Sequence, residues 1–225
     1  MVRLFLVCLM VSACGDDGNH PADAAAQPIA ITGELVDWDS GPGPAFCGVF
    51  QAKLTQHDAA TNTVNTAPNG RITLMVPDAT GVQIDVTPPT AASQCATGGL
   101  YQVPGVIVTN QDVLESGLTQ SYRLIGADRL TAFYASLGLT YDPAKAIVFV
   151  HVEGTHQAVK STAAHDAAVA FDGTAWAAGE KGEDVVFPNS QPIMTTIDFT
   201  TGSGKGAMSV TATAGTITYV TLIGL

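Results

Sequence analysis

Residues 71–76 read RITLMV, with an apolar side chain at every second position. A period of two residues predicts a β-strand that buries one face. The remaining strands expected in this part of the chain are at 29–36, 50–55, 82–87 and 101–108. Turn signals rich in Gly, Pro and Asn separate them, and Pro104-Gly105 should interrupt the last one. Short strands at this spacing predict a β-sandwich over residues 29–110.

The C-terminal part of the chain, from about residue 143, also contains short stretches that predict strands. The expected strands are at 148–153, 167–171, 175–178, 185–187, 196–199, 208–214 and 216–223. The sequence therefore predicts a mainly β protein with two consecutive small β-sandwich blocks, 29–110 and 143–225.

The segment 111–142 joins the two blocks and has a different pattern. Leu130, Phe133, Tyr134 and Leu137 follow the i, i+3, i+4, i+7 spacing of one helical face, which predicts a helix at about 128–137. Asp128 is the expected N-cap, and Gly138 is expected to end the helix. The two aromatic residues are expected in the core, although a ligand-binding role is an alternative.

The charge balance excludes one class of function. The chain has 20 Asp and Glu against 9 Lys and Arg, for a net charge of −11, so it lacks the clustered cations that bind nucleic acid. Hydrophobic residues make up 46% of the chain and charged ones 13%, which excludes an intrinsically disordered protein.

The first 13 residues follow the order of a secretory signal: Arg3, then a short apolar run, then small residues. The run is too short for the ~20 residues of a membrane-spanning helix. Val11-Ser12-Ala13-Cys14 resembles the lipobox of bacterial lipoproteins, which implies cleavage before Cys14 and acylation of that residue. The alternative is a buried N-terminal strand with an incidental cysteine.

A polar segment follows the expected lipidation site. Residues 14–28 lack large apolar side chains and are interpreted as a flexible tether. Gly15, rather than Asp, follows Cys14, which in the bacterial sorting pattern favours the outer membrane. The expected location is therefore outside the cytoplasm, with the lipid in the outer membrane and the protein on its periplasmic or surface face.

Two cysteines remain once Cys8 leaves with the signal and Cys14 takes the lipid. In an exported protein, Cys47 and Cys95 are most simply a disulfide. Two free thiols or a redox pair are the alternatives, but the close C-x-x-C spacing of redox pairs is missing.

The first block carries a family resemblance. Residues 31–37, ITGELVD, followed by residues 66–77, TAPNGRITLMVP, resemble carboxypeptidase regulatory-like domains. The resemblance covers about 29–90. It implies a transthyretin-like sandwich of about seven strands that serves as a non-catalytic accessory module, with no catalytic residues to carry over. The sequence departs from the family pattern at Ile72, where an aromatic residue is common.

Few residues suggest catalysis or metal binding. The candidate zinc ligands are His151, Glu153 and His156, with His165 nearby. The preferred interpretation is that these side chains are polar groups in contact with solvent. No metal or other cofactor is expected. Two acidic segments, Asp37-x-Asp39-Ser40 and residues 180–184, offer oxygen ligands for Ca²⁺. The preferred interpretation is that they are solvated turns and not Ca²⁺ sites.

Other candidate motifs are weaker still. Residues 202–206, GSGKG, lack the phosphate-loop spacing and are expected in a hairpin loop. A sugar-stacking surface built from Trp38, Trp176 and Tyr101 is an alternative to their packing in the core.

The expected function is that of a non-enzymatic, lipid-anchored cell-envelope protein with a structural or protein-interaction role. Its expected partners are the membrane, through the lipid on Cys14, and an envelope protein or glycan. One alternative is a carbohydrate- or peptide-binding module at the cell surface. The other is a metal-dependent hydrolase that uses His151, Glu153 and His156.

Overall fold

The computed structural model describes residues 27–40, 46–92, 94–95, 99–200 and 205–224, and the alternation seen in the sequence recurs there as alternating burial. In β4 (Arg71–Val76), Ile72, Leu74 and Val76 are buried and the residues between them are exposed. The expected signal, the expected lipidation site Cys14, most of the expected tether and the 202–204 part of the expected loop lie outside the described residues.

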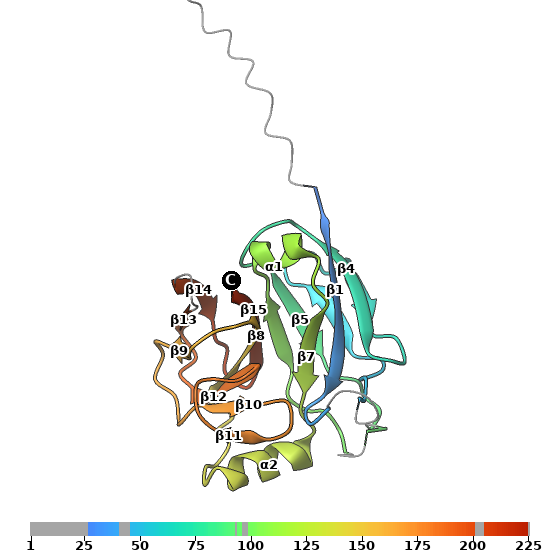
Figure 1. Cartoon of the computed structure of the whole chain (residues 1–225). Helices are drawn as coiled ribbons and strands as arrows, with labels where there is room; N and C mark the ends of the chain where they lie inside the picture. The colour runs from blue at the N-terminus through green and yellow to red at the C-terminus, as the bar shows by residue number, and fades with distance from the viewer. Residues whose placement is uncertain (1–26, 41–45, 93, 96–98, 201–204, 225) are drawn as a thin grey trace, which may run out of the picture.

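A nine-stranded sheet forms the centre of the described molecule (Figure 1). Its strands are β2 (Lys53–Gln56), β3 (Thr63–Asn65), β5 (Gln83–Thr87), β6 (Gly105–Val108), β8 (Ala146–Gly154), β10 (Val169–Phe171), β11 (Trp176–Ala178), β12 (Asp184–Ser190) and β15 (Ile217–Gly224). Their order is β11-β10-β12-β8-β15-β6-β5-β2-β3. The mainly β class predicted from the sequence is confirmed.

The last strand of the chain holds this sheet together. β15 lies between β6 and β8 and is parallel to both of them. Strands from 29–110 and from 143–225 therefore lie in one sheet. The two groups of strands meet where β6 is hydrogen-bonded to β15.

Two three-stranded sheets cover the central sheet. One contains β4, β1 (Ile29–Asp37) and β7 (Gln120–Leu124), with β1 in the middle. The other contains β14 (Lys205–Thr211), β13 (Met194–Thr200) and β9 (Val159–Ser161), with β13 in the middle. β7 comes from the segment 111–142, where the sequence predicted only a helix.

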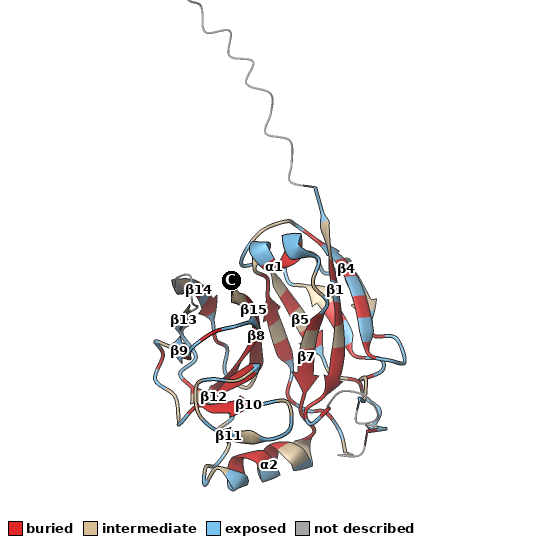
Figure 2. Ribbon diagram, viewed as in Figure 1, coloured by how far each residue is buried: buried red, intermediate tan, exposed pale blue. Residues whose placement is uncertain are grey.

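Two hydrophobic cores lie on opposite faces of the central sheet, because successive side chains of a strand point to opposite faces. Ile147 and Phe149 of β8 belong to the first core, beneath the β4-β1-β7 sheet. Val148 and Val150 belong to the second core, beneath the β14-β13-β9 sheet. Figure 2 shows β8 and β15 buried along most of their length. The expectation that 148–153 buries a single face is corrected, because both faces of β8 are covered.

Two helices complete the described part of the chain. α2 (Ala127–Ser136) confirms the predicted helix, with Leu130, Phe133 and Tyr134 buried. Its N-cap is Gly126, so the prediction of Asp128 as the cap is wrong; Asp128 lies in the first turn. α1 (Gln111–Ser116) was not predicted; it is capped by the Asn110 side chain, which accepts from the Asp112 amide at 3.0 Å.

A disulfide joins Cys47 to Cys95, as the sequence predicted. It connects the loop after β1 to the loop after β5, across a separation of 48 residues. Within the described residues, no helix is long and apolar enough to cross a membrane.

Candidate functional site

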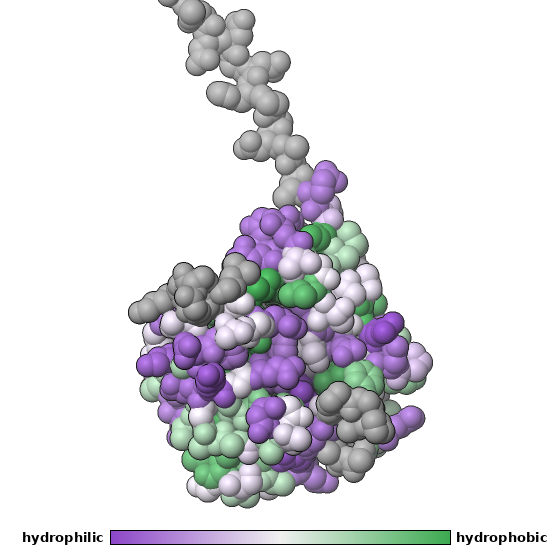
Figure 3. Space-filling view, in the orientation of Figure 1, coloured by the Kyte–Doolittle hydropathy of each residue, from purple (hydrophilic) through white to green (hydrophobic). Residues whose placement is uncertain are grey.

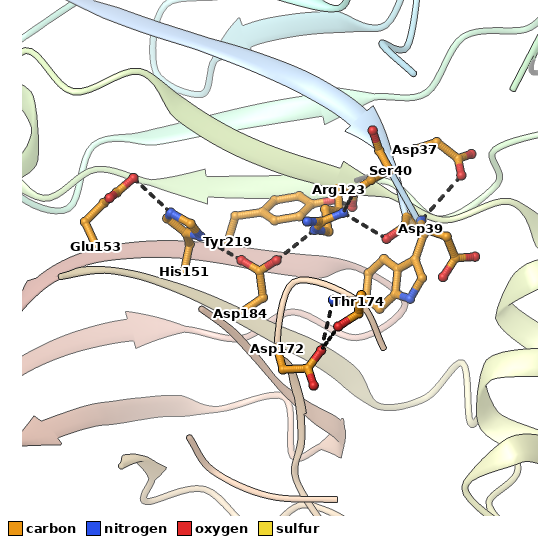
Figure 4. A network of polar contacts seen from close by, with 11 residues as sticks. Asp37, Asp39, Ser40, Arg123, His151, Glu153, Asp172, Thr174, Asp184 and Tyr219 are labelled. Atoms are coloured by element: carbon orange, nitrogen blue, oxygen red, sulfur yellow. Dashed lines mark hydrogen bonds and ion pairs between the residues drawn. The ribbon is translucent and has the colours of Figure 1, made fainter. Parts of the chain in front are cut away.

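A chain of charged side chains crosses the interior from β8 to β7 (Figure 4). Glu153 Oε1 lies 3.1 Å from His151 Nε2, and His151 Nδ1 lies 2.7 Å from Asp184 Oδ1. Arg123 Nε then donates to Asp184 Oδ2 at 2.8 Å. We call Glu153, His151, Asp184 and Arg123 the charge network.

Strand register explains how the charge network assembles. His151 and Asp184 are directly opposite each other in the antiparallel pair of β8 and β12, so their side chains share a face. Glu153 follows His151 by two positions and lies on that same face. Arg123 comes from β7 in the covering sheet, so its bond to Asp184 links two layers of the fold.

The guanidinium of Arg123 has further partners at the layer interface. Nη1 donates to the carbonyls of Ser40 at 2.6 Å and Trp38 at 3.2 Å. The guanidinium carbon lies 4.7 Å from the centroid of the Phe171 ring, a cation–π distance. The side chain is only 10% exposed, so these contacts replace its hydration.

The charges of the network balance when His151 is protonated. Burial alone would lower the pKa of His151, but the hydrogen bonds and negative charges of Asp184 and Glu153 outweigh it and raise this pKa from 6.5 to about 9. Both ring nitrogens then donate to carboxylates. The charge network then contains two cations and two anions, so each charge has a partner of opposite sign. Such pairing is the condition under which buried charges are tolerated.

A pocket of ≈ 350 Å³ adjoins Arg123 between the two layers. Its lining residues are Glu34, Val36, Ser40, Phe46, Ser121, Arg123, Phe171, Gly173 and Glu183. The turn after Phe171 is fixed by Asp172, whose carboxylate accepts from the Thr174 amide at 2.9 Å and the Thr174 hydroxyl at 2.8 Å. Hydrogen bonds from the Ala175 amide and from Thr174 lower the pKa of Asp172.

The three candidate zinc ligands are only partly brought together. His151 and Glu153 are in contact, but both nitrogens of His151 face carboxylates. His156 Nδ1 lies 3.3 Å from the carbonyl of Gly154 instead. Among the residues that the structure describes, no group of three or more His, Cys, Asp and Glu side chains is arranged to hold a metal ion.

The two acidic segments considered for Ca²⁺ have protein partners. Asp37 is buried and accepts from the Tyr101 hydroxyl at 2.7 Å, and Asp39 pairs with Arg129 of α2. In the segment 180–184, Asp184 is part of the charge network. These contacts give Asp37, Asp39 and Asp184 structural roles.

The aromatic residues considered for sugar stacking lie in the first core. Trp38 is fully buried and stacks on Trp176, with ring centroids 5.1 Å apart. Phe133 of α2 meets both rings edge-on. Tyr101 is also buried. Trp38 and Tyr101 therefore have no face exposed to a sugar, and Phe133 and Tyr134 have the expected core role.

Sequence reasoning missed Arg123, and it considered Asp184 only as part of an acidic segment for Ca²⁺, not as a partner of His151. Asp184 lies 33 residues from His151 and 61 from Arg123, so no local spacing connects them. A usable signal was the single arginine inside the apolar stretch 122–125, YRLI, because a charge in a buried strand needs a partner.

In comparisons with known proteins, no family model matches the chain, and no curated protein matches it.

Proposed function

We propose that the chain is a non-enzymatic, lipid-anchored protein of the bacterial cell envelope whose β domain acts through contacts with other proteins. The observation that carries the proposal is the order of features at the N-terminus. A short apolar run leads to Val11-Ser12-Ala13-Cys14, a polar segment follows, and β1 begins at Ile29. Acyl chains on Cys14 would hold the domain at the membrane, in the outer membrane given Gly15.

The disulfide supports the location outside the cytoplasm. A bond between Cys47 and Cys95 persists in an oxidising compartment, whereas cytosolic thiols are kept reduced. Both cysteines follow the proposed cleavage site, so they stay in the mature protein.

The charge network supports a structural rather than a catalytic role for its members. Each of its four side chains has charged partners within the protein, and a protonated His151 cannot accept a proton or bind a metal. The network ties β7 to β8 and β12 across the layer interface.

The arrangement of the first seven strands supports a carboxypeptidase regulatory-like domain as part of the proposal. β1, β4 and β7 form one sheet, and β2, β3, β5 and β6 lie together in the facing one. Domains of that kind are accessory modules, which agrees with a protein-interaction role.

Metabolic labelling with a palmitate analogue tests the anchor. The wild-type protein, produced in a bacterium that processes lipoproteins, should take up the label, and C14S should lose it. C8S is the matched control, because this cysteine lies in the same N-terminal region but before the cleavage site, and it should label like wild type. An unlabelled wild-type protein, or labelling of C14S, would overturn the proposal.

A further inference from the structure

A groove of ≈ 760 Å³ lies between α1, β14 and the end of β15. In Figure 1, α1 and the β13–β14 pair lie on either side of the end of β15. The apolar part of its lining is Phe199, Ala207, Met208, Leu222 and Ile223. Met208 and Leu222 also belong to the second core, so the groove is the open end of that core.

β14 is an edge strand along this groove. It pairs with β13 on one side, and no other described strand pairs with its outer edge. Four consecutive residues of β14, 206–209, line the groove, so the groove follows the strand. An unpaired edge offers backbone donors and acceptors to an added strand.

One side chain gives the groove an apolar wall. Phe199 of β13 is directly opposite Gly206 of β14, and a Cβ on Gly206 would lie 2.2 Å from the Phe199 ring. The absence of that Cβ lets the ring pack against the backbone of β14. An incoming apolar side chain can therefore contact an aromatic surface beside the edge.

The negative charge of the groove favours a positively charged binding partner. Asp112 and Glu115 of α1 line it and are exposed, and the described lining residues include no Lys, Arg or His. Figure 3 shows the hydrophilic surface over α1 next to hydrophobic atoms. The chain itself has a net charge of −11, so a second copy is disfavoured, as is the tether with Asp16, Asp17 and Asp23.

We propose that the groove binds an extended segment of a partner protein, apolar with interspersed Lys or Arg, which adds as a strand to the outer edge of β14. The partner's apolar side chains contact Phe199 and Leu222, and its cations face Asp112 and Glu115. This inference rests on the proposed role in protein contacts and not on the lipid anchor, which the labelling of Cys14 tests separately.

The test uses the full protein as a bacterium produces it, purified in a mild uncharged detergent, and a fluorescent peptide, Lys-Val-Thr-Ile-Lys-Val-Thr-Ile. Saturable binding is expected by anisotropy, with slower amide hydrogen exchange in β14. D112N/E115Q should weaken binding about fivefold, as two exposed ion pairs are lost. D58N/D128N, which neutralises two exposed carboxylates away from the groove, should leave binding unchanged.

A variant that fills the groove provides a second measurement. A207R adds bulk and positive charge to an exposed position of β14 and should abolish binding, while the melting temperature stays close to that of wild type. The proposal is overturned if the peptide does not bind, if a peptide with Glu in place of Lys binds equally, or if D112N/E115Q binds like wild type. Protein dimerisation that protects β14 would overturn it in favour of a second copy.

Discussion

At the residue scale, the protonation of His151 links stability to pH. Its pKa is about 9 in the folded protein against 6.5 when unfolded, so its stabilising contribution is complete below pH 6.5 and is lost as pH rises through 9. H151Q should therefore lower the free energy of unfolding at pH 6, by on the order of 3 kcal/mol, and by much less at pH 10. Urea denaturation at pH 6, 8 and 10 measures this difference.

His57 supplies the control for that experiment. Its pKa is also raised, by the hydrogen bond and then the charge of Asp85, but the pair is exposed to solvent. Screening by water weakens such pairs, so H57Q should change the pH profile far less. A wild-type advantage over H151Q that stays constant from pH 6 to 10 would contradict the account of His151.

Replacement of Arg123 tests the charge network at a second residue. R123M keeps an unbranched aliphatic chain but leaves Asp184 buried without its guanidinium partner. It also removes the donors to two backbone carbonyls. Loss of one partner of a buried pair should reduce the free energy of unfolding by about 3 to 5 kcal/mol. R71M, at an exposed position of β4, should change it by less than about 0.5 kcal/mol. Similar values for the two variants in denaturant titrations would argue against the network.

At the element scale, the close approach of β1 and β7 requires glycine at position 33. A Cβ there would lie 2.6 Å from the carbonyl oxygen of Gln120, part of the backbone of the neighbouring strand. G33A should force β7 away and lower the free energy of unfolding by about 1 to 3 kcal/mol. T32A, the exposed neighbour on β1, serves as the control and should be near neutral in thermal melts. An unchanged melting temperature for G33A would refute the close approach.

The elements also show which parts of the fold can be predicted from sequence. Period-two alternation found β4 and β5 because each buries one face. β7 was missed because its burial does not alternate and because Arg123 lies inside it. The pairing of β15 with β6 joins residues more than one hundred positions apart, and no local pattern encodes such a contact.

In the candidate site, too, local patterns could be predicted from sequence and contacts between distant residues could not. His151 and Glu153 attracted attention because titratable residues at alternate positions share a strand face. Their role depends on Asp184 of β12, which contacts His151, and on Arg123 of β7, which contacts Asp184. The metal hypothesis followed from the types of residue alone, whereas the hydrogen bonds give His151 two carboxylate partners.

At the scale of the whole molecule, the disulfide restrains the unfolded chain. Closing a loop over a separation of 48 residues is expected to stabilise the fold by about 4 kcal/mol through loop entropy. C47S/C95S should lose about 2 to 4 kcal/mol in urea denaturation, and wild type under reducing conditions should approach the same value. Equal stability of the oxidised and reduced wild type would contradict a structural role.

The whole molecule is also the scale at which membrane attachment acts, because a lipid on Cys14 would hold every strand near the bilayer. The mass of the N-terminal peptide of the mature protein, isolated from bacterial membranes, tests this most directly. The predicted result is a peptide that begins at Cys14 and carries fatty acyl groups. A peptide that retains residues 1–13, or one with an unmodified Cys14, would contradict it.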